Sequence, residues 1–275
     1  MHEAPAPLDP AGSPRCDLDR GLLGGCVSHP VGLTNADGHP NRRGDPSSNC
    51  YGLACIPSGD QAAINARLVA AGDVAVLCPG AVFQLTGPVV FSADGQAIYT
   101  QGFPTDDRRA VLRIASPSVT SAVRMIDRSN VVLSNVVVDG NRPKLGRLDG
   151  DALIEAGGPG SGQVVRGVRA LETRSWSTIH IFEGGNPRCS GALIEDNEIG
   201  PAGRPDGNWA DGISLACTNS IVRNNTITDA TDGGIVIFGA PGSLIEGNVI
   251  RAQHATLLGG INMVDYLPFN GDFRE

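Results

Sequence analysis

The sequence predicts an all-β solenoid, in which the chain winds in successive turns and each turn contributes a few short parallel strands. One segment occurs three times, at Gly191–Ile199, Asn219–Ile227 and Gly242–Ile250. A second segment alternates with it, at Asp211–Leu215, Gly233–Ile237 and Gly259–Met263. Interleaved short motifs that recur about every 20–50 residues are the signature of a solenoid. Both segments are rich in Ile, Val and Leu and are bounded by Gly, Asn or Asp, which indicates strands rather than helices.

Equivalent side chains of successive turns should form columns, because parallel strands pair about 4.8 Å apart. We align Val131–Asn135 and Val164–Val168 with Leu193–Asn197. The alignment predicts a column of asparagine amides that hydrogen-bond along the axis, with Val168 as the exception. This column consists of Asn135, Asn197, Asn225 and Asn248. A second column alternates in charge and is expected to be solvated. It consists of Arg166, Glu195, Arg223 and Glu246.

Cysteines give a third column and an estimate of the redox environment. Cys189 and Cys217 each lie four residues before the first apolar residue of their strand. A separation of about 5 Å between neighbouring turns suits a disulfide, which we predict here. Of the seven cysteines, four lie between Cys16 and Cys55, and this usage favours an extracellular protein. The start of the chain does not read as a signal peptide, so a leader is expected to have been removed or the chain to be a fragment.

The chain divides into an irregular, cysteine-containing arm over residues 1–54 and a solenoid domain over residues 55–275, whose C-terminal turns are expected to be missing. Asp60–Gly72 has an amphipathic helical pattern, with Ser58 or Asp60 as its cap. This short helix is expected to cover the open edges of the first turn. Cys55 and Cys78 bracket it and are placed to tie it to that turn.

A series of predicted strands follows the helix. They are Val74–Leu77, Pro79–Leu85, Val89–Phe91, Ala97–Thr100, Val111–Ile114, Val131–Val138, Val164–Leu171 and Thr178–Phe182. Two loops interrupt them, Asp139–Gly150 and Ala156–Gly162, and such insertions frequently shape a binding face. The formal charge of −8 and the pI near 5.1 argue against nucleic-acid binding. No apolar run has membrane-spanning length. The sequence leaves the oligomeric state open.

On these repeats, residues 56–275 resemble the right-handed, single-stranded parallel β-helix of the pectin-lyase-like superfamily. That superfamily includes pectate lyases, polygalacturonases, alginate-modifying enzymes and phage tailspikes. The resemblance is one of fold, and it implies a secreted protein whose partner is a polysaccharide. The predicted fold class is therefore an all-β, right-handed parallel β-helix with a short N-terminal capping helix.

Two aspartates carry a more specific resemblance. Asn208–Ile213 resembles the Asn-Thr-Asp-Gly-Ile segment of polygalacturonases, and Thr231–Ile235 lies where that family has Asp-Asp-Cys-Ile. The resemblance implies that Asp211 is the first family aspartate and Asp232 the general acid. Gly233 replaces the family's second base aspartate. The His-Gly and Arg-Ile-Lys motifs of the family have no counterpart in the chain.

The two aspartates suit acid–base chemistry by their spacing alone. Asp211 and Asp232 fall one turn apart and one residue out of register, which places their backbones roughly 6 Å apart. Two carboxylates at that distance repel, so one pKa rises and that group can act as an acid beside a base. The alternative is ordinary turn chemistry, because Asp before Gly is common at strand entrances.

Further candidates lie on the same face. His180 is expected to point into solvent, in a column with Ser214, Val236 and Asn262, as a general base or sugar contact. The alternative for His180 is a surface side chain that is hydrogen-bonded to Glu183. The predicted substrate-binding residues are Trp176, Glu183, Trp209 and Asn262. The indoles suit stacking against sugar rings, or else they fill loops.

These residues lead to three functional hypotheses. The first is a secreted glycoside hydrolase that acts on an acidic or cell-wall polysaccharide through Asp211, Asp232 and His180, without cofactor or metal. The second is a uronate lyase or C5-epimerase, which needs a base and a cation. Its candidates are His180, Arg174, Lys144 and a Ca²⁺ site of Asp211, Asp232 and Glu183. The third is a non-catalytic, glycan-binding or structural β-helix.

Overall fold

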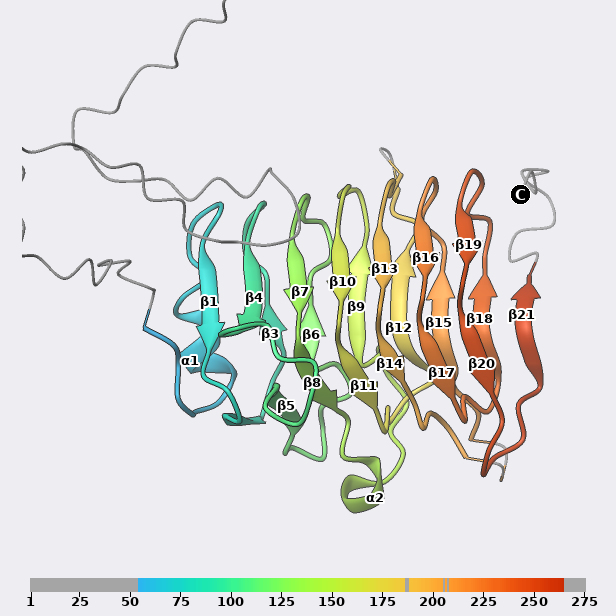
Figure 1. Cartoon of the computed structure of the whole chain (residues 1–275), viewed down its shortest axis with the longest axis horizontal. Helices are drawn as coiled ribbons and strands as arrows, with labels where there is room; N and C mark the ends of the chain where they lie inside the picture. Colours follow the sequence, from blue (N-terminus) through green and yellow to red (C-terminus); the bar gives the residue numbers. More distant parts are fainter. Residues whose placement is uncertain (1–53, 186–187, 205, 207, 265–275) are drawn as a thin grey trace, which may run out of the picture. The chain divides into compact units, whose positions relative to one another are not determined.

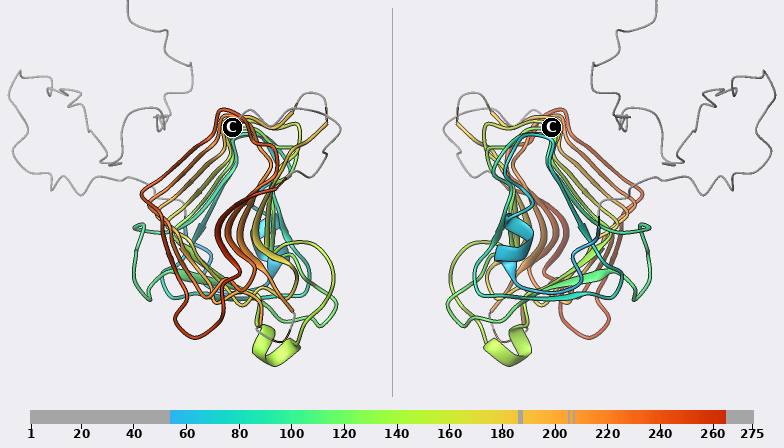
Figure 2. Two further views of the ribbon diagram at one scale, coloured as in Figure 1. Left: turned by 90° about the vertical axis from the view of Figure 1, so that its right-hand side faces the viewer. Right: turned by 90° about the vertical axis from the view of Figure 1, so that its left-hand side faces the viewer.

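The described residues form a parallel β-helix of three sheets. The computed structural model describes residues 54–264 except 186–187, 205 and 207. All of these lie within the compact unit Leu53–Glu275. Figure 1 shows the strands side by side along the long axis of this unit, and Figure 2 shows the successive turns superposed along that axis. The expectations for the arm, including Cys16, Cys26 and Cys50, fall outside the described residues.

Each turn contributes one strand to each sheet. The first sheet consists of β1 (Val74–Leu77), β4 (Ala97–Thr100), β7 (Val132–Ser134), β10 (Val164–Arg166), β13 (Leu193–Glu195), β16 (Ile221–Arg223) and β19 (Leu244–Glu246). The second consists of β2 (Val82–Leu85), β5 (Ala110–Ile114), β8 (Val136–Asp139), β11 (Arg169–Leu171), β14 (Glu198–Ile199), β17 (Thr226–Thr228) and β20 (Val249–Arg251). The third consists of β3 (Val89–Val90), β6 (Val123–Arg124), β9 (Ile154–Gly157), β12 (Ser177–Phe182), β15 (Asp211–Leu215), β18 (Gly233–Ile237) and β21 (Gly259–Met263).

The core is a set of stacked aliphatic columns inside the coil. In the first sheet, the middle residue of each strand points inward and lies directly above its equivalent in the next turn. The buried members of this column are Ala75, Ile98, Leu133, Val165, Ile194 and Val222. Burial of a Val, Leu or Ile side chain stabilises a fold by roughly 1.5–3 kcal/mol. The register is therefore fixed, because a slip of one residue would turn the whole column outward.

A single residue in the left-handed conformation joins the first sheet to the second in five successive turns. These residues are Asn135, Gly167, Asp196, Asn224 and Gly247, with φ between 48° and 63°. Only Gly, Asn and Asp adopt this conformation readily. The predicted strands Val131–Val138 and Val164–Leu171 are therefore each two strands, divided by a bend at Asn135 and at Gly167.

The asparagine column is confirmed for three of its four predicted members. Asn197 Nδ2 donates to Asn225 Oδ1 at 2.8 Å, and Asn225 Nδ2 donates to Asn248 Oδ1 at 2.9 Å. The position of Asn135 in this column was wrong. Val132, and not Val131, pairs with Val164, so Asn135 lies one residue earlier, in the left-handed bend.

The charged column is confirmed in register, but its centre is buried. Glu195 forms ion pairs with Arg166 on one side and with Arg223, at 2.7 Å, on the other. The Glu195 side chain is only 5% exposed, so the expectation of a fully solvated column was wrong. The two flanking guanidinium groups cover the carboxylate and neutralise it.

Two disulfides join neighbouring turns, as predicted. Cys189 pairs with Cys217 and Cys55 pairs with Cys78, each with a Cα–Cα distance of 4.8 Å. Cys55–Cys78 ties the segment before the first helix to the end of β1.

The capping helix is shorter than predicted. Helix α1 spans Gln61–Asn65, and Asp60 caps it by accepting hydrogen bonds from the amides of Ala62 and Ala63. Beyond Asn65 the chain leaves the α-helix, because the following amides donate to carbonyls three residues back and then to the side chain of Asp73. Within the described residues, no helix combines the length and apolar character that a membrane crossing needs.

The predicted loop Asp139–Gly150 contains a second short helix. Helix α2 spans Arg142–Leu145 and carries Lys144 in an exposed position. Arg142 is buried and donates to the carbonyl of Asn208 at 3.4 Å, so this insertion packs against the loop that precedes β15.

Candidate active site

One column of side chains on the third sheet faces away from the core. Its members are Arg124, Glu155, His180, Ser214, Val236 and Asn262. The flanking residues in β9 and β12, such as Ile154 and Ile181, belong to the core. Since neighbouring side chains of a strand point to opposite faces, the column lies on the outer face. The predicted column from His180 to Asn262 is confirmed, and Arg124 and Glu155 extend it by two strands.

His180 is buried, and the expectation of a solvent-facing side chain was wrong. Its ring lies between Phe182, at a centroid distance of 3.8 Å, and Trp176, at 4.8 Å. Phe182 belongs to the same strand as His180, and Trp176 directly precedes that strand. The two rings cover the imidazole. Burial lowers the pKa of His180 to about 4, so the ring is neutral at pH 7. Nδ1 has no hydrogen-bond partner among the described residues, and the alternative bond to Glu183 is not formed.

Asp211 lies at the start of β15 and is held by a short hydrogen-bond chain. Its Oδ2 accepts from Ser214 Oγ at 2.8 Å, and Ser214 Oγ lies 2.7 Å from Ser177 Oγ on the neighbouring strand. Its Oδ1 accepts from the amide of Gly233 at 3.1 Å. Burial raises the pKa of Asp211 to about 6, although these hydrogen bonds oppose the shift. Asp211 can therefore carry a proton in weakly acidic solution.

Asp232 lies beside Asp211 with the predicted offset. The amide of Asp232 donates to the carbonyl of Ala210, so Asp232 directly precedes β18 and lies one residue out of register with Asp211, the first residue of β15. The nearby charge of Asp232 adds to the raised pKa of Asp211, but burial is the larger cause. At Gly233, where polygalacturonases have a further aspartate, an added Cβ would lie 2.2 Å from Val236 Cγ2. An aspartate there would require Val236 to move.

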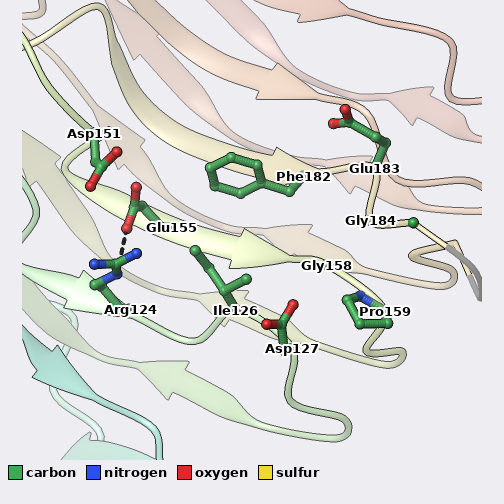
Figure 3. A pocket seen from close by; sticks show the side chains of 11 residues that line it. Arg124, Ile126, Asp127, Asp151, Glu155, Gly158, Pro159, Phe182, Glu183 and Gly184 are labelled. Carbon is green, nitrogen blue, oxygen red and sulfur yellow. Dashed lines mark ion pairs between the residues drawn. The ribbon is translucent and has the colours of Figure 1, made fainter.

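A pocket next to His180 contains acidic residues that the sequence reasoning missed. It has a volume of about 410 Å³, and its charged lining residues are Arg124, Asp127, Asp151, Glu155 and Glu183. Figure 3 shows Glu155 between Asp151 and Arg124, with Phe182 and Ile126 toward the middle of the pocket. The sequence did contain a signal, because Leu153–Glu155 repeats the pattern of Thr178–His180 one turn earlier.

Glu155 is the most perturbed acid of the pocket. Its side chain has no exposed surface, and its Oε2 lies 2.9 Å from Arg124 Nε. This contact is an ion pair by distance, but neither carboxyl oxygen has a hydrogen-bond partner among the described residues. Burial, reinforced by Asp151, raises the pKa of Glu155 to about 7, and Arg124 and the nearby Ser121 hydroxyl only partly offset this.

The remaining predicted site residues are divided between the column and the pocket. Trp176 and Trp209 are 39% and 48% exposed, and the carbonyl of Trp176 accepts from the Asp211 amide at 2.8 Å. Asn262 ends the column. Glu183 lines the acidic pocket and does not join Asp211 and Asp232. Over the described part of the chain, no three His, Cys, Asp or Glu residues are grouped closely enough to hold a metal ion. The predicted Ca²⁺ site of Asp211, Asp232 and Glu183 is therefore not formed.

Arg174 does not face the site. Its side chain is 2% exposed, and its guanidinium donates to backbone carbonyls of the surrounding loops. These carbonyls belong to Ser116, Pro117, Val119, Leu145 and Gly146. The prediction that Arg174 neutralises a substrate was wrong, because all of its donors serve the fold. Arg124 is the arginine that lies on the outer column.

Comparisons with known proteins agree with this architecture. A family model described as a right-handed β-helix region matches residues 121–266, which is more than half of the chain. Among solved structures, the alginate lyase from Paenibacillus sp. str. FPU-7 is similar with a TM-score of 0.45 and 17% identity, over 70% of this chain and 75% of that chain. No curated protein matches the sequence. The family match confirms the predicted fold, including its right hand.

Proposed function

Because the chain belongs to the right-handed β-helix family, we propose that it is a secreted enzyme that cleaves a polysaccharide along the outer face of the third sheet. A fold does not fix an activity, so the proposal rests on the site. The observation that carries it is the pair of Asp211, at the start of β15, and Asp232, directly before β18, with the pKa of Asp211 raised to about 6. Perturbed carboxyl groups on an accessible face are typical of acid–base catalysts.

The preferred reaction is glycoside hydrolysis. Asp211 donates its proton to the glycosidic oxygen as the bond to the leaving sugar breaks. Asp232, which is half-exposed, takes the role of the second carboxylate, as base or nucleophile. This order differs from the one that the polygalacturonase resemblance implies, because the raised pKa belongs to Asp211. Trp176 and Trp209 offer exposed indole rings on which sugar units can stack.

A second candidate is a uronate lyase or C5-epimerase, and a specific observation favours it. His180 is neutral and its Nδ1 has no partner among the described residues, so it can accept the proton at the sugar C5. Arg124 lies two strands away in the same column and would neutralise the uronate carboxylate by exchanging its contact with Glu155 for one with the substrate. A requirement for Ca²⁺ belongs to this candidate and not to the hydrolase.

The proposed location is extracellular. Cys55–Cys78 and Cys189–Cys217 are disulfides between adjacent turns, and such bonds persist in oxidising surroundings. The expected partner is a polysaccharide.

A panel of polysaccharides tests the proposed function. We expect the full-length protein to release new reducing ends from at least one polymer, with no rise in ultraviolet absorbance and no effect of a chelator. Reducing ends accompanied by absorbance of an unsaturated uronate would replace the hydrolase by the lyase. Retained binding to a glycan with no cleavage of any polymer would leave a binding module and contradict the proposal.

A further inference from the structure

The acidic pocket beside His180 carries a net negative charge, which a neutral or anionic polysaccharide would not neutralise. Among the described residues, four carboxyl groups line it, and the Arg124 guanidinium is the positive group beside them. Asp127, Asp151 and Glu183 are exposed and form no ion pair with any described residue. The pocket therefore repels anions and attracts cations, since the Arg124 guanidinium is already held by Glu155.

Glu155 shows independently that the pocket is built to hold a donor. A carboxyl group with no exposed surface normally accepts several hydrogen bonds, because an unsatisfied buried group costs free energy. Oε2 of Glu155 has only the ion-pair contact with Arg124, and Oε1 has no partner among the described residues. The side chain lines the pocket between Asp151 and Arg124, as Figure 3 shows. A ligand that brings N–H or O–H donors to this point would satisfy it.

The distribution of the carboxylates points to an extended organic cation and not to a metal ion. Ca²⁺ requires its oxygen ligands about 2.3–2.6 Å from a single point. No three acidic side chains of the described chain meet that condition. Figure 3 instead shows Asp151 and Glu155 at one end, Asp127 and Glu183 toward the other, and the apolar side chains of Phe182 and Ile126 between them.

That arrangement matches a sugar ring that carries amines. The faces of a sugar ring are apolar C–H surfaces that pack on an aromatic side chain such as Phe182, and its polar substituents project from the edges. The pocket volume of about 410 Å³ lies within the usual range for small-molecule sites. We propose that this pocket binds an oligosaccharide of amino-sugar units with free, protonated amines, one amine held by Asp151 and another by Glu183. The proposal rests on the proposed function, since it names the substrate class of the same face.

Binding measurements with a matched pair of oligosaccharides test the proposal. The first probe is a glucosamine oligomer with free amines, and the second is the same oligomer in fully N-acetylated form. Isothermal titration calorimetry in weakly acidic buffer gives both affinities. We expect the free-amine oligomer to bind at least about tenfold more tightly, with a preference that weakens as salt is raised.

The double variant Asp151→Asn, Glu183→Gln should abolish most of this preference. Both side chains are exposed and make no hydrogen bond to the described residues, so the substitutions leave the fold intact. Asp107→Asn is the matched control, since it removes an exposed carboxylate on the loop between β4 and β5 and should leave the preference unchanged. Equal affinity for the two oligomers, tighter binding of a uronate oligomer, or a preference that survives in the double variant would overturn the proposal.

The same measurement on Asp232→Asn separates this proposal from the proposed function. The variant should keep the preference for the amine, because Asp232 does not line the pocket. An amine preference in a protein that cleaves no polymer would refute the enzyme and retain the pocket. Cleavage of a polymer without amines, together with equal binding of the two oligomers, would refute the pocket and retain the enzyme.

Discussion

Asp211→Asn should lower the rate of polymer cleavage by about 10²–10⁴-fold, which is the usual contribution of a general acid. Asparagine has the shape of aspartate, so it can keep the contacts of Asp211 with Ser214 and with the amide of Gly233. It cannot donate an acidic proton to a leaving sugar. The variant should therefore fold normally and bind the polymer while losing turnover, as initial rates and a thermal melt would show.

The pH profile of the wild-type enzyme gives the same test without a substitution. The pKa of Asp211 is raised to about 6, so its proton is present below that pH and lost above it. Activity should fall as pH rises through about 6, and this descending limb should be absent from the residual activity of Asp211→Asn. Asp107→Asn is the control for a general change in surface charge. Wild-type activity that is constant across this range, or a variant rate within about twofold of wild type, would remove Asp211 from the mechanism.

Arg174→Met should destabilise the fold by about 3–5 kcal/mol, the usual effect of breaking a buried charged network. Arg174 is 2% exposed and donates to five backbone carbonyls, which methionine would leave buried without partners. These carbonyls lie in the loop after β5 and at the end of α2. The Arg174 side chain therefore ties both segments to the residues just before β12. Denaturant unfolding monitored by circular dichroism measures the loss.

Arg108→Met is the matched control for this substitution. Arg108 pairs with Asp106 at 3.1 Å, but both side chains are more than half exposed, so its removal should leave the free energy of unfolding nearly unchanged. Under conditions where the Arg174 variant is still folded, its activity per folded molecule should equal that of wild type. A stable Arg174 variant with impaired binding of a uronate polymer would contradict the structural role and restore the substrate role.

The repeats were sufficient to predict most of the fold, because each repeat shows independently which of its residues align with those of the next turn. Asn197, Asn225 and Asn248 occupy one column since the strands before them have identical spacing. Asn135 was aligned one residue out of place because Val131 and Val132 are both apolar. The pattern therefore did not show which of them begins the pairing. The early end of α1 at Asn65 was not predictable, because the sequence has no Gly or Pro between that residue and Gly72 to mark it.

The site was predictable where strand spacing alone decides it, as for Asp211 and Asp232. It was not predictable where covering side chains decide it. The alternation of β12 correctly placed His180 on the outer face, but only the folded chain shows Trp176 and Phe182 packed around the ring. Arg174 was mispredicted for the same reason: it was expected at the site, but its partners hold it inside the fold. Its sequence context shows a charged residue in a loop, whereas its carbonyl partners lie 28 to 58 residues away.

The central claim is that the outer face of the third sheet is where a polysaccharide is cleaved. A crystal structure of Asp232→Asn in complex with an oligomer of the cleaved polymer tests it most directly. We expect sugar units to lie across β9, β12 and β15, with a glycosidic oxygen within hydrogen-bond distance of Asp211 and a ring stacked on Trp176 or Trp209. An oligomer bound to the first or second sheet, with the third sheet empty, would contradict the account.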